Sequence, residues 1–518
     1  MEFLQNLKPR DYQQEIFESC INKNCLVVLP TGLGKTLIAL MLTIERMKSF
    51  PGEKVLFLAP TKPLAEQHLK YFKKNLPELF GEMQLFTGTV KAENRKKIWQ
   101  TADIIFSTPQ CIANDLRKRL YSLNEVCLLI EDEAHRCIKN YDYRYIAEQY
   151  RESSAHQRII GLTASPGSEK SKIKDICKNL SIEEVEIRTR DSSDVKEHLQ
   201  ELEFEKRMLD FPPEFEEIRK VLLKLFNEYV EELRVRKVLF GPASKTDLIN
   251  LQKRISSTIT RNFTNFNYMQ GASACAQAIK LQHALELLET QTLAGFYKYL
   301  QGLFDQASKK QSKGVVKLVS KPEFNFIFSQ ANELLVKKTE HPKVQELMKI
   351  INEEKKENKK VKILIFTQFR ETASNISKRI NELQGIKSKI FIGQAKKDGE
   401  GLNQKQQKKV IEEFSEGKIN VLCATCIAEE GLDIPEVNVV VFYEPIPSAI
   451  RTIQRAGRTA RLMKGKLIML ITKKTRDEAF FYVSKSREKK MKTAIESIKE
   501  DFANKRNGLK TEVQKKLQ

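Results

Sequence analysis

The 518-residue sequence has little of what marks an exported or membrane-bound protein. Its nine cysteines are scattered and odd in number, which excludes the dense disulfide framework of a small secreted domain. No run approaches the roughly 18 to 20 apolar residues that a membrane-spanning helix needs. The segment from Met1 to Arg10 carries charges and Pro9 without an apolar run behind it, so we expect no signal peptide. These absences predict a soluble protein of the cytoplasm, or of the nucleus if the source is eukaryotic.

One cysteine pair has a suggestive spacing. Cys423-Ala-Thr-Cys426 matches a zinc or redox pair, but no second pair accompanies it and it lies in a strand-to-loop run. We therefore interpret both residues as structural thiols.

Acidic residues are also fewer than basic ones. Lys and Arg number 89 against 67 Asp and Glu, which gives a formal net charge of +22. Such a field attracts a polyanion, so nucleic acid is the expected partner. A Lys-covered helical surface would give the same balance, and charge alone does not separate the two.

Two series of short apolar runs are present, each run being followed by a helix-like segment. Runs that are apolar throughout are typical of parallel strands buried on both faces, which predicts an α/β fold. The first series comprises Cys25–Pro30, Val55–Pro60, Asp103–Pro109, Val126–Asp132 and Arg158–Ala164, and the second comprises Val361–Phe366, Lys389–Gly393, Val421–Thr425, Val437–Tyr443 and Leu467–Thr472.

Between the two series the sequence is rich in Leu, Lys and Glu at helical spacing, which predicts a helical insert. The length suits roughly three domains. We therefore expect an α/β region over residues 1–200, an all-helical insert over 201–334, a second α/β region over 335–483 and a basic tail over 484–518. The scattered apolar residues of the tail leave two alternatives open, a packed helix and a solvated end.

A glycine-rich loop follows the first apolar run. In Pro30-Thr-Gly-Leu-Gly-Lys-Thr36, two glycines let backbone N–H groups approach phosphates, and the helix that follows adds a partial positive charge. Lys35 could reach the β and γ phosphates, and the Thr36 hydroxyl could bind Mg²⁺. An ordinary Gly-rich turn would explain this loop if it stood alone, and Leu29 occupies a position where the general pattern has Gly.

Acidic residues end the run Val126–Asp132. Ligands of parallel α/β sheets bind at the carboxyl ends of strands, where Asp132 could hold Mg²⁺ and Glu133 could activate water. An acidic helix cap is the alternative. Arg10 and Gln13, before the first run, could read an adenine edge, although a surface helix start explains them almost as well.

With a second α/β region, the loop and the sequence Asp132-Glu-Ala-His135 resemble superfamily 2 helicases. That resemblance implies two RecA-like lobes that close on ATP and Mg²⁺. Further motifs stand in the family's order: Ala59-Pro-Thr-Lys-Pro63, Thr87-Gly88, Thr108-Pro-Gln110, Thr163-Ala-Ser165, Ile365-Phe-Thr-Gln-Phe-Arg370, Ala424-Thr425, Glu430-Gly-Leu-Asp433 and Gln454-Arg-Ala-Gly-Arg-Thr-Ala-Arg461.

The resemblance implies a role for residues in three groups. Catalysis falls to Lys35, Asp132, Glu133, His135, Gln454, Arg458 and Arg461. Nucleotide contacts fall to Arg10, Gln13, Pro30, Thr31, Gly32, Leu33, Gly34, Lys35, Thr36, Gly431 and Asp433, with Thr36 and Asp132 as metal ligands. Backbone contacts to nucleic acid fall to Thr61, Lys62, Gly88, Thr108, Thr367 and Thr425.

The sequence is similar in particular to the archaeal Hef fork helicases and their Fanconi anaemia M relatives, through Pro60-Thr-Lys-Pro-Leu64, Gly393-Gln-Ala395 and Phe442–Arg451. This implies an insert that recognises forked or branched DNA, with replication or repair proteins as partners. Ala456 and Ala460 depart from the family pattern, and we interpret them as harmless. Since no ERK-type metal motif follows, nuclease activity is not predicted.

The predicted function is therefore ATP-driven helicase or translocase activity on forked DNA. An RNA-stimulated ATPase with the same inserted helical domain is the first alternative. A nucleic-acid-binding scaffold with an inactive ATPase site is the second, and the intact Lys35, Asp132, Glu133, Arg458 and Arg461 argue against it.

Overall fold

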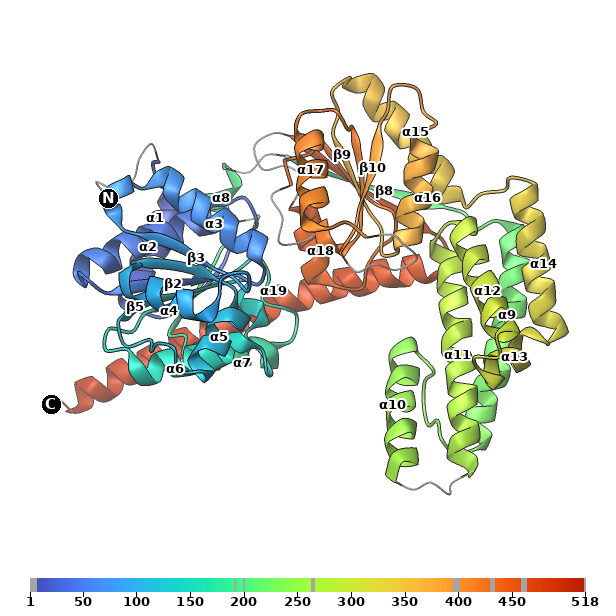
Figure 1. The fold of residues 1–518 in the computed structure, drawn as a ribbon, viewed down its shortest axis with the longest axis horizontal. Coiled ribbons are helices and arrows are strands. Elements are labelled where there is room, and N and C mark those ends of the chain that lie inside the picture. Colours follow the sequence, from blue (N-terminus) through green and yellow to red (C-terminus); the bar gives the residue numbers. More distant parts are fainter. Residues whose placement is uncertain are drawn as a thin grey trace.

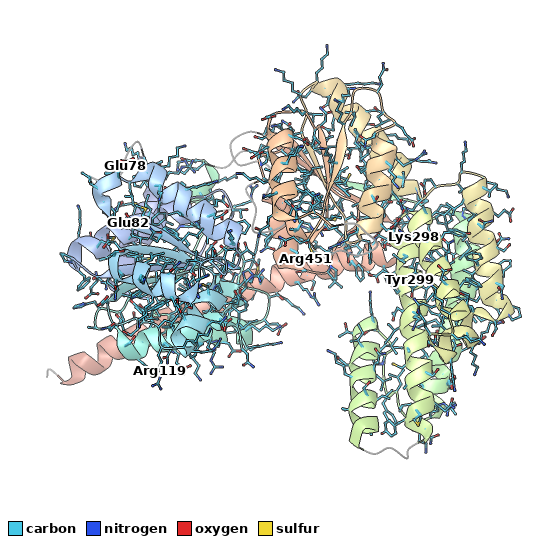
Figure 2. All side chains as sticks on the ribbon, viewed as in Figure 1. Glu78, Glu82, Arg119, Lys298, Tyr299 and Arg451 are labelled. Atoms are coloured by element: carbon cyan, nitrogen blue, oxygen red, sulfur yellow. The ribbon has the colours of Figure 1, made fainter. Side chains whose placement is uncertain are left out.

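The computed structural model describes residues 7–190, 192–198, 201–261, 266–394, 401–428, 434–457 and 464–516. Over these ranges the chain forms two parallel β-sheets, each covered by helices, and a separate bundle of helices (Figure 1). The side chains gather in the same three bodies (Figure 2). No described helix is both long and apolar enough to cross a membrane. The predicted fold class, two parallel-sheet lobes with a helical domain, is confirmed.

The first sheet has seven parallel strands in the order β3-β4-β2-β5-β6-β1-β7. Its inner strands are buried along their whole length because helices cover both faces. The edge strands β3 and β7 are only partly buried. They were not predicted, because polar residues interrupt their sequences and neither forms a continuous apolar run. The strands are β1 (Cys25–Val28), β2 (Lys54–Leu58), β3 (Met83–Phe86), β4 (Ile104–Ser107), β5 (Val126–Asp132), β6 (Ile159–Thr163) and β7 (Glu184–Ile187).

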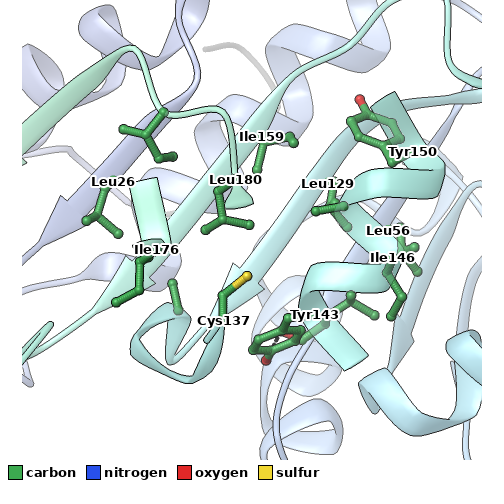
Figure 3. Packing of buried hydrophobic residues seen from close by; sticks show 14 of the residues in the cluster. Leu26, Leu56, Leu129, Cys137, Tyr143, Ile146, Tyr150, Ile159, Ile176 and Leu180 are labelled. Atoms are coloured by element: carbon green, nitrogen blue, oxygen red, sulfur yellow. Dashed lines mark hydrogen bonds between the residues drawn. The ribbon is translucent and has the colours of Figure 1, made fainter. Parts of the chain in front are cut away.

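Helices cover this sheet on both sides (Figure 1). On one face, Leu26, Leu129 and Ile159 from the strands pack against Ile146 and Ile176 from the helices (Figure 3). The helices of this first lobe are α1 (Asp11–Asn22), α2 (Lys35–Ser49), α3 (Lys62–Asn75), η1 (Glu78–Phe80), α4 (Ala92–Thr101), α5 (Pro109–Arg117), η2 (Ala134–Arg136), α6 (Asp142–Ser153), α7 (Lys170–Asn179) and α8 (Ser193–Lys196).

The second sheet has six parallel strands in the order β10-β11-β9-β12-β13-β8. The strands are β8 (Leu202–Leu209), β9 (Ile363–Phe366), β10 (Ser388–Phe391), β11 (Val421–Ala424), β12 (Val439–Phe442) and β13 (Gly465–Thr472). The helices of this second lobe are α15 (Pro342–Glu357), α16 (Arg370–Ile380), α17 (Gln404–Ser415), η3 (Cys426–Ala428), α18 (Ala449–Ala456) and α19 (Arg476–Lys516). Cys423 is buried in β11, whereas Cys426 is exposed in η3.

The edge strand β8 differs from the expectation, because it lies where we expected the all-helical insert over 201–334 to begin. Leu202 to Leu209 pair in parallel with Gly465 to Thr472. Charged residues interrupt the apolar ones along β8, as an edge strand that is partly exposed permits, so no continuous apolar run marked it.

The helical bundle leaves the second lobe after β8 and returns to it at α15. Its helices are α9 (Pro213–Val235), α10 (Lys245–Arg261), α11 (Phe266–Thr290), α12 (Leu293–Ser308), α13 (Lys313–Val319) and α14 (Pro322–Val336). They share a core of their own, and Lys298 on α12 reaches Glu371 on α16 at 2.6 Å where the bundle meets the second lobe (Figure 2).

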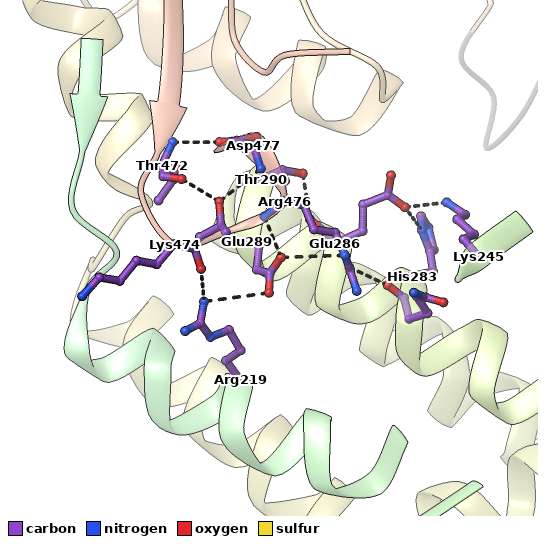
Figure 4. A network of polar contacts seen from close by, with 12 residues as sticks. Arg219, Lys245, His283, Glu286, Glu289, Thr290, Thr472, Lys474, Arg476 and Asp477 are labelled. Atoms are coloured by element: carbon purple, nitrogen blue, oxygen red, sulfur yellow. Dashed lines mark hydrogen bonds and ion pairs between the residues drawn. The ribbon is translucent and has the colours of Figure 1, made fainter. Parts of the chain in front are cut away.

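A buried polar network also fastens the bundle to the second lobe (Figure 4). Lys343 and Asp477 form an ion pair whose side chains are fully buried, and the backbone N–H of Thr472 donates to Asp477 at 3.0 Å. Beside this pair, the backbone N–H of Arg476 donates to Glu289 of α11 at 3.2 Å. The network lies where α19 begins, so the bundle and α19 share one anchor.

Helix α19 runs from that anchor along the second lobe to the first (Figure 1). Met491, Ile495 and Ile498 are buried within the hydrophobic core cluster of the first lobe. Asp501 forms ion pairs with Lys170 and Lys174 of α7, with N–O distances of 3.2 and 3.0 Å. Residues 484–516 of the expected basic tail therefore belong to a long helix that joins the lobes, which is the packed-helix alternative, because an apolar stripe lies among its charges.

We expect Asp477→Ala to lower the free energy of unfolding by about 3–5 kcal/mol, because it leaves the Lys343 charge buried without its partner. Urea denaturation measures the effect. The control is Glu333→Ala, which removes an exposed pair with Lys337 and should leave the midpoint unchanged. Equal midpoints for both variants would contradict the expectation.

Candidate active site

The carboxyl ends of the strands in the first sheet lie at one edge, and the predicted motifs follow them directly. The glycine-rich loop follows β1, Glu133 follows β5, and Thr163 ends β6. Strand β6 lies between β1 and β5, so these three motifs are neighbours. Parallel pairing therefore places the loop and the acidic group in one location.

The loop has the backbone of an anion site. Gly32 and Gly34 have φ angles of 87° and 83°, in the left-handed region that residues with a Cβ seldom adopt. Helix α2 begins at Lys35 with no acidic residue in its first turn. The Lys35 Nζ donates to the carbonyl oxygen of Leu29 at 2.8 Å, so its charge lies over the loop. These features suit a phosphate group.

The predicted pair Arg10 and Gln13 lies against this loop. The Gln13 Nε2 donates to the carbonyl oxygen of Leu33 at 3.0 Å, and its Oε1 accepts from the backbone N–H of Arg10 at 2.9 Å. A Cβ on Gly34 would lie 2.2 Å from that Nε2. Gly34 is thus required both by its φ angle and by the close approach of Gln13.

Asp132, the predicted metal ligand, is joined to Thr36 through a histidine. His68 of α3 lies 2.9 Å from Asp132 Oδ2 through its Nε2 and 3.5 Å from Thr36 Oγ1 through its Nδ1. Burial acts to raise the pKa of Asp132, but the hydrogen bond from His68 and the nearby charge of Lys35 hold that pKa below its ordinary value. Asp132 is thereby kept as a carboxylate.

The next residues of the motif connect the site to α19. Glu133 has a φ of 52°, and its Oε2 lies 3.2 Å from His135 Nδ1. The same nitrogen lies 3.2 Å from the Thr163 hydroxyl. Two residues on, the Ser165 hydroxyl donates to the sulfur of Met491 in α19 at 2.8 Å. A continuous set of contacts therefore runs from the acidic motif to the helix that joins the lobes.

The second lobe meets the loop at Gly457, directly after α18. A Cβ on Gly457 would lie 1.8 Å from the Thr31 hydroxyl oxygen, so the backbone at Gly457 lies directly against the Thr31 side chain. Gln454, one turn earlier, is 3% exposed. The other predicted catalytic and nucleotide-contacting residues of this lobe lie outside the described residues: Gly431, Asp433, Arg458 and Arg461.

The predicted nucleic-acid residues of the first lobe lie at the same edge. Thr61 and Thr108 are the N-cap residues of α3 and α5, Lys62 begins α3, and Gly88 is exposed after β3. Within the described residues, the Thr61 hydroxyl oxygen has no hydrogen-bond partner.

Two predicted residues of the second lobe lie deeper. Thr367 is fully buried, and its hydroxyl donates to Gln291 Oε1 at 3.5 Å, at the end of the helical bundle. Thr425 is 5% exposed after β11. The structure thus turns the Thr367 side chain toward the bundle and not toward solvent.

Sequence reasoning missed two residues of this region. His68 was not singled out, because a single histidine on a helix carries no motif. Arg95 of α4 forms a buried ion pair with Asp115 of α5 and donates to the carbonyl oxygen of Val90, which holds the loop around Gly88. No spacing rule links these positions.

The adjacent carboxyl groups of Glu131 and Asp132 on β5 face opposite sides of the sheet, and their pKa values shift in opposite directions. Asp132 points toward His68, whereas Glu131 points to the opposite face, where it is fully buried near Cys137. Burial raises the pKa of Glu131 to about 8, against a weaker opposing effect of the Cys137 hydrogen bond. Glu131 is therefore largely protonated at neutral pH and belongs to the core.

Three family models match the chain in order. They are the DEAD/DEAH box helicase over residues 10–173, the helical bundle of a putative ATP-dependent RNA helicase over 214–341, and the helicase conserved C-terminal domain over 342–463.

Individual proteins are similar over almost the whole chain. A putative ATP-dependent RNA helicase of Methanocaldococcus jannaschii is 36% identical over 95% of this chain and 61% of its own length. The Fanconi anemia group M protein homolog of Mus musculus is 30% identical over 95% of this chain and 26% of its own. The chain thus spans less than two thirds of the length of these relatives.

Among solved structures, the Hef helicase domain of Pyrococcus furiosus superposes with a TM-score of 0.71 at 40% identity, over 93% of this chain and 100% of that one. The DEAD/DEAH box and C-terminal helicase models, which match the two parallel-sheet lobes in order, define the class of superfamily 2 helicases. Within that class the chain belongs to the family of Hef and Fanconi anaemia M proteins, which confirms the predicted resemblance.

We expect Gly457→Ala to reduce ATP turnover by about 10-fold or more, because the added methyl group would displace Thr31 and the loop. The backbone at Gly457 has a φ of −68°, so the loss would come from the contact and not from the backbone conformation. Gly302→Ala is the control, since a Cβ there meets nothing within 4 Å. Unchanged steady-state turnover in the Gly457 variant would show that the approach is unimportant.

We expect Glu131→Gln to flatten the pH dependence of stability. The pKa of Glu131 is 4.5 in the unfolded chain and is raised to about 8 in the folded one. The protonated carboxyl therefore stabilises the folded state fully below pH 4.5, and this stabilisation is lost as the pH rises through about 8. Above about pH 8, the variant should therefore be more stable than the parent by on the order of a few kcal/mol. Chemical denaturation over a pH series measures this, with the exposed Glu93→Gln as control; parallel profiles would refute it.

Proposed function

We propose that the chain hydrolyses ATP with Mg²⁺ and uses the cycle to translocate on or unwind forked or branched DNA. One observation carries this proposal: Gly457 of the second lobe lies against Thr31 of the glycine-rich loop. That approach supports a nucleotide site closed by both lobes, because the predicted Arg458 follows Gly457 directly in the sequence.

The ATP site is proposed from the first lobe's residues. The loop from Pro30 to Thr36 would hold the phosphates through backbone N–H groups, and Lys35 would neutralise their charge. Thr36 and Asp132 supply hard oxygen donors, which fits Mg²⁺. When bound, Mg²⁺ would stabilise the charge that develops on the phosphates. Glu133 would orient and deprotonate the attacking water.

The second lobe would complete the reaction. Arg458 and Arg461, assigned by resemblance, would stabilise the transferring phosphoryl group, and an arginine in this role is worth about 10³ to 10⁵ in rate. Hydrolysis would break the bond to the γ-phosphoryl group, and release of the phosphate product would then remove the charge that both lobes contact. Their reopening would then change the grip of each lobe on nucleic acid.

The nucleic-acid path is proposed along the strand ends of the first lobe. Thr61, Lys62, Gly88 and Thr108 stand at helix starts or in an exposed loop, where backbone N–H groups and hydroxyls suit phosphates. Such contacts fix the position of the protein on the nucleic acid but do not read the base sequence. On the second lobe, Thr425 remains a candidate, whereas a contact by Thr367 would first require its side chain to leave Gln291.

Forked DNA is the favoured substrate because relatives of the family are named as DNA helicases. They include fml1 of Schizosaccharomyces pombe, 30% identical over 90% of this chain, and mph1 of Neurospora crassa, 33% identical over 92%. RNA stays as the alternative, since the Methanocaldococcus jannaschii relative and the bundle model are named for RNA helicases. Replication or repair proteins are the proposed partners.

We expect forked DNA to stimulate ATP turnover more than single-stranded DNA or duplex RNA does, because the bundle would add contacts at a branch. Lys35→Ala and Glu133→Gln should each reduce stimulated turnover by about 10²-fold or more. Steady-state phosphate release measures both, with Lys73→Ala, on the exposed side of α3, as the control.

A preference for duplex RNA would transfer the proposal to the RNA alternative. Turnover unaffected by Lys35→Ala would remove the assignment of the ATP site. Binding to DNA without any ATP turnover in the parent chain would favour the scaffold with an inactive site.

A further inference from the structure

We infer that His68 is a positioning residue that sets the orientation of Thr36 and Asp132 for Mg²⁺ and couples them to nucleic acid bound at the start of α3. The inference rests on the proposed function and deepens it. It starts from one structural fact: His68 contacts both proposed metal ligands at once.

His68 is held firmly in place. Its side chain is 7% exposed and lies over Phe57 of β2, with the ring centroids 4.4 Å apart. Phe72, one helical turn further along α3, packs edge-on against the same Phe57. The imidazole therefore cannot turn away from the site unless α3 itself moves.

The hydrogen bonds determine which nitrogen carries the proton. A carboxylate only accepts, so the His68 Nε2 must donate to Asp132 Oδ2 across their 2.9 Å separation. In the neutral ring the Nδ1 is then an acceptor, so the Thr36 hydroxyl donates to it across 3.5 Å. His68 thus fixes a donor on one side and an acceptor on the other.

This arrangement prepares both oxygens for a cation. A hydroxyl that donates its proton to His68 keeps its lone pairs available, and a cation needs those lone pairs. Asp132 uses Oδ2 for His68, which leaves Oδ1 to bind the cation. Groups that orient metal ligands in this way typically change metal affinity by about 10- to 100-fold when they are removed.

The helix that carries His68 also begins at the proposed nucleic-acid contact. Thr61 is the N-cap residue of α3 and Lys62 its first residue, and His68 lies six positions after Lys62 along the helix. Six residues of helix span about 9 Å. A phosphate that pulls on the start of α3 would therefore shift His68 against Thr36 and Asp132 without any intervening loop.

Two variants test the inference. His68→Gln keeps an amide N–H for Asp132 and an amide oxygen for Thr36, whereas His68→Leu fills similar space with neither. Lys73→Ala, on the exposed side of the same helix, is the matched control. Thermal unfolding establishes that all variants are folded before binding is measured.

The readout is the affinity for ADP, measured by calorimetry with Mg²⁺ and again in EDTA, at one fixed pH. We expect His68→Leu to weaken ADP binding by about 10- to 100-fold with Mg²⁺ and to leave binding in EDTA unchanged. His68→Gln should retain most of the affinity. Equal losses with Mg²⁺ and in EDTA, or a Gln variant as weak as the Leu variant, would overturn the inference.

A second arm adds single-stranded DNA to the same titrations. In the parent chain we expect DNA to change the Mg²⁺-dependent affinity for ADP, and in His68→Leu this effect should be lost. DNA coupling that persists in His68→Leu would overturn the link through α3. If the parent chain itself shows no Mg²⁺-dependent binding of ADP, the proposed function fails and not the role of His68 alone.

Discussion

Parallel pairing is the constraint on which the rest of the molecule depends. When every strand of a sheet runs in the same direction, all carboxyl ends lie at one edge, and each connection must cross back through a helix. The glycine-rich loop after β1, the carboxylate of β5 and the N-cap residue of α3 therefore meet in space although long stretches of sequence separate them. No single side chain creates the site, because the direction of the strands does.

A second constraint acts between the lobes. Helix α19 buries Met491, Ile495 and Ile498 in the core of the first lobe, and its first turn belongs to the network that holds the helical bundle. Between those ends, the hydroxyl of Ser484 lies 3.1 Å from that of Thr452 on α18. One helix therefore contacts the bundle, the segment that carries Gly457, and the loop of Ser165, so these regions cannot rearrange independently.

Much of the fold was readable from the sequence, because buried parallel strands are apolar at every position. That rule predicted the inner strands of both sheets and the edge strand β10, and it missed β3, β7 and β8, whose edge positions permit polar residues. The C-terminal segment was left open between a packed helix and a solvated end, since its apolar stripe is sparse among lysines.

Only those residues of the candidate site that belong to short local motifs could be predicted from the sequence. Gly32, Gly34, Lys35 and Asp132 lie within local motifs, and local backbone geometry accounts for their positions. The contacts of His68 with Thr36 and Asp132 depend on how α3 packs against the sheet. The burial of Thr367 depends on its contact with Gln291, at the end of the helical bundle. Both are long-range contacts, which no spacing in the sequence expresses.

The length of α19 has a mechanical consequence. Its stretch from Arg476, at the bundle, to Ile498, in the core of the first lobe, is about 33 Å long, so a rotation of about 5° at one end would displace the other by about 3 Å. A helix anchored at the bundle and buried in the first lobe therefore acts as a lever arm, which converts a small change of angle in either body into a displacement comparable to the spacing of nucleotides along a strand.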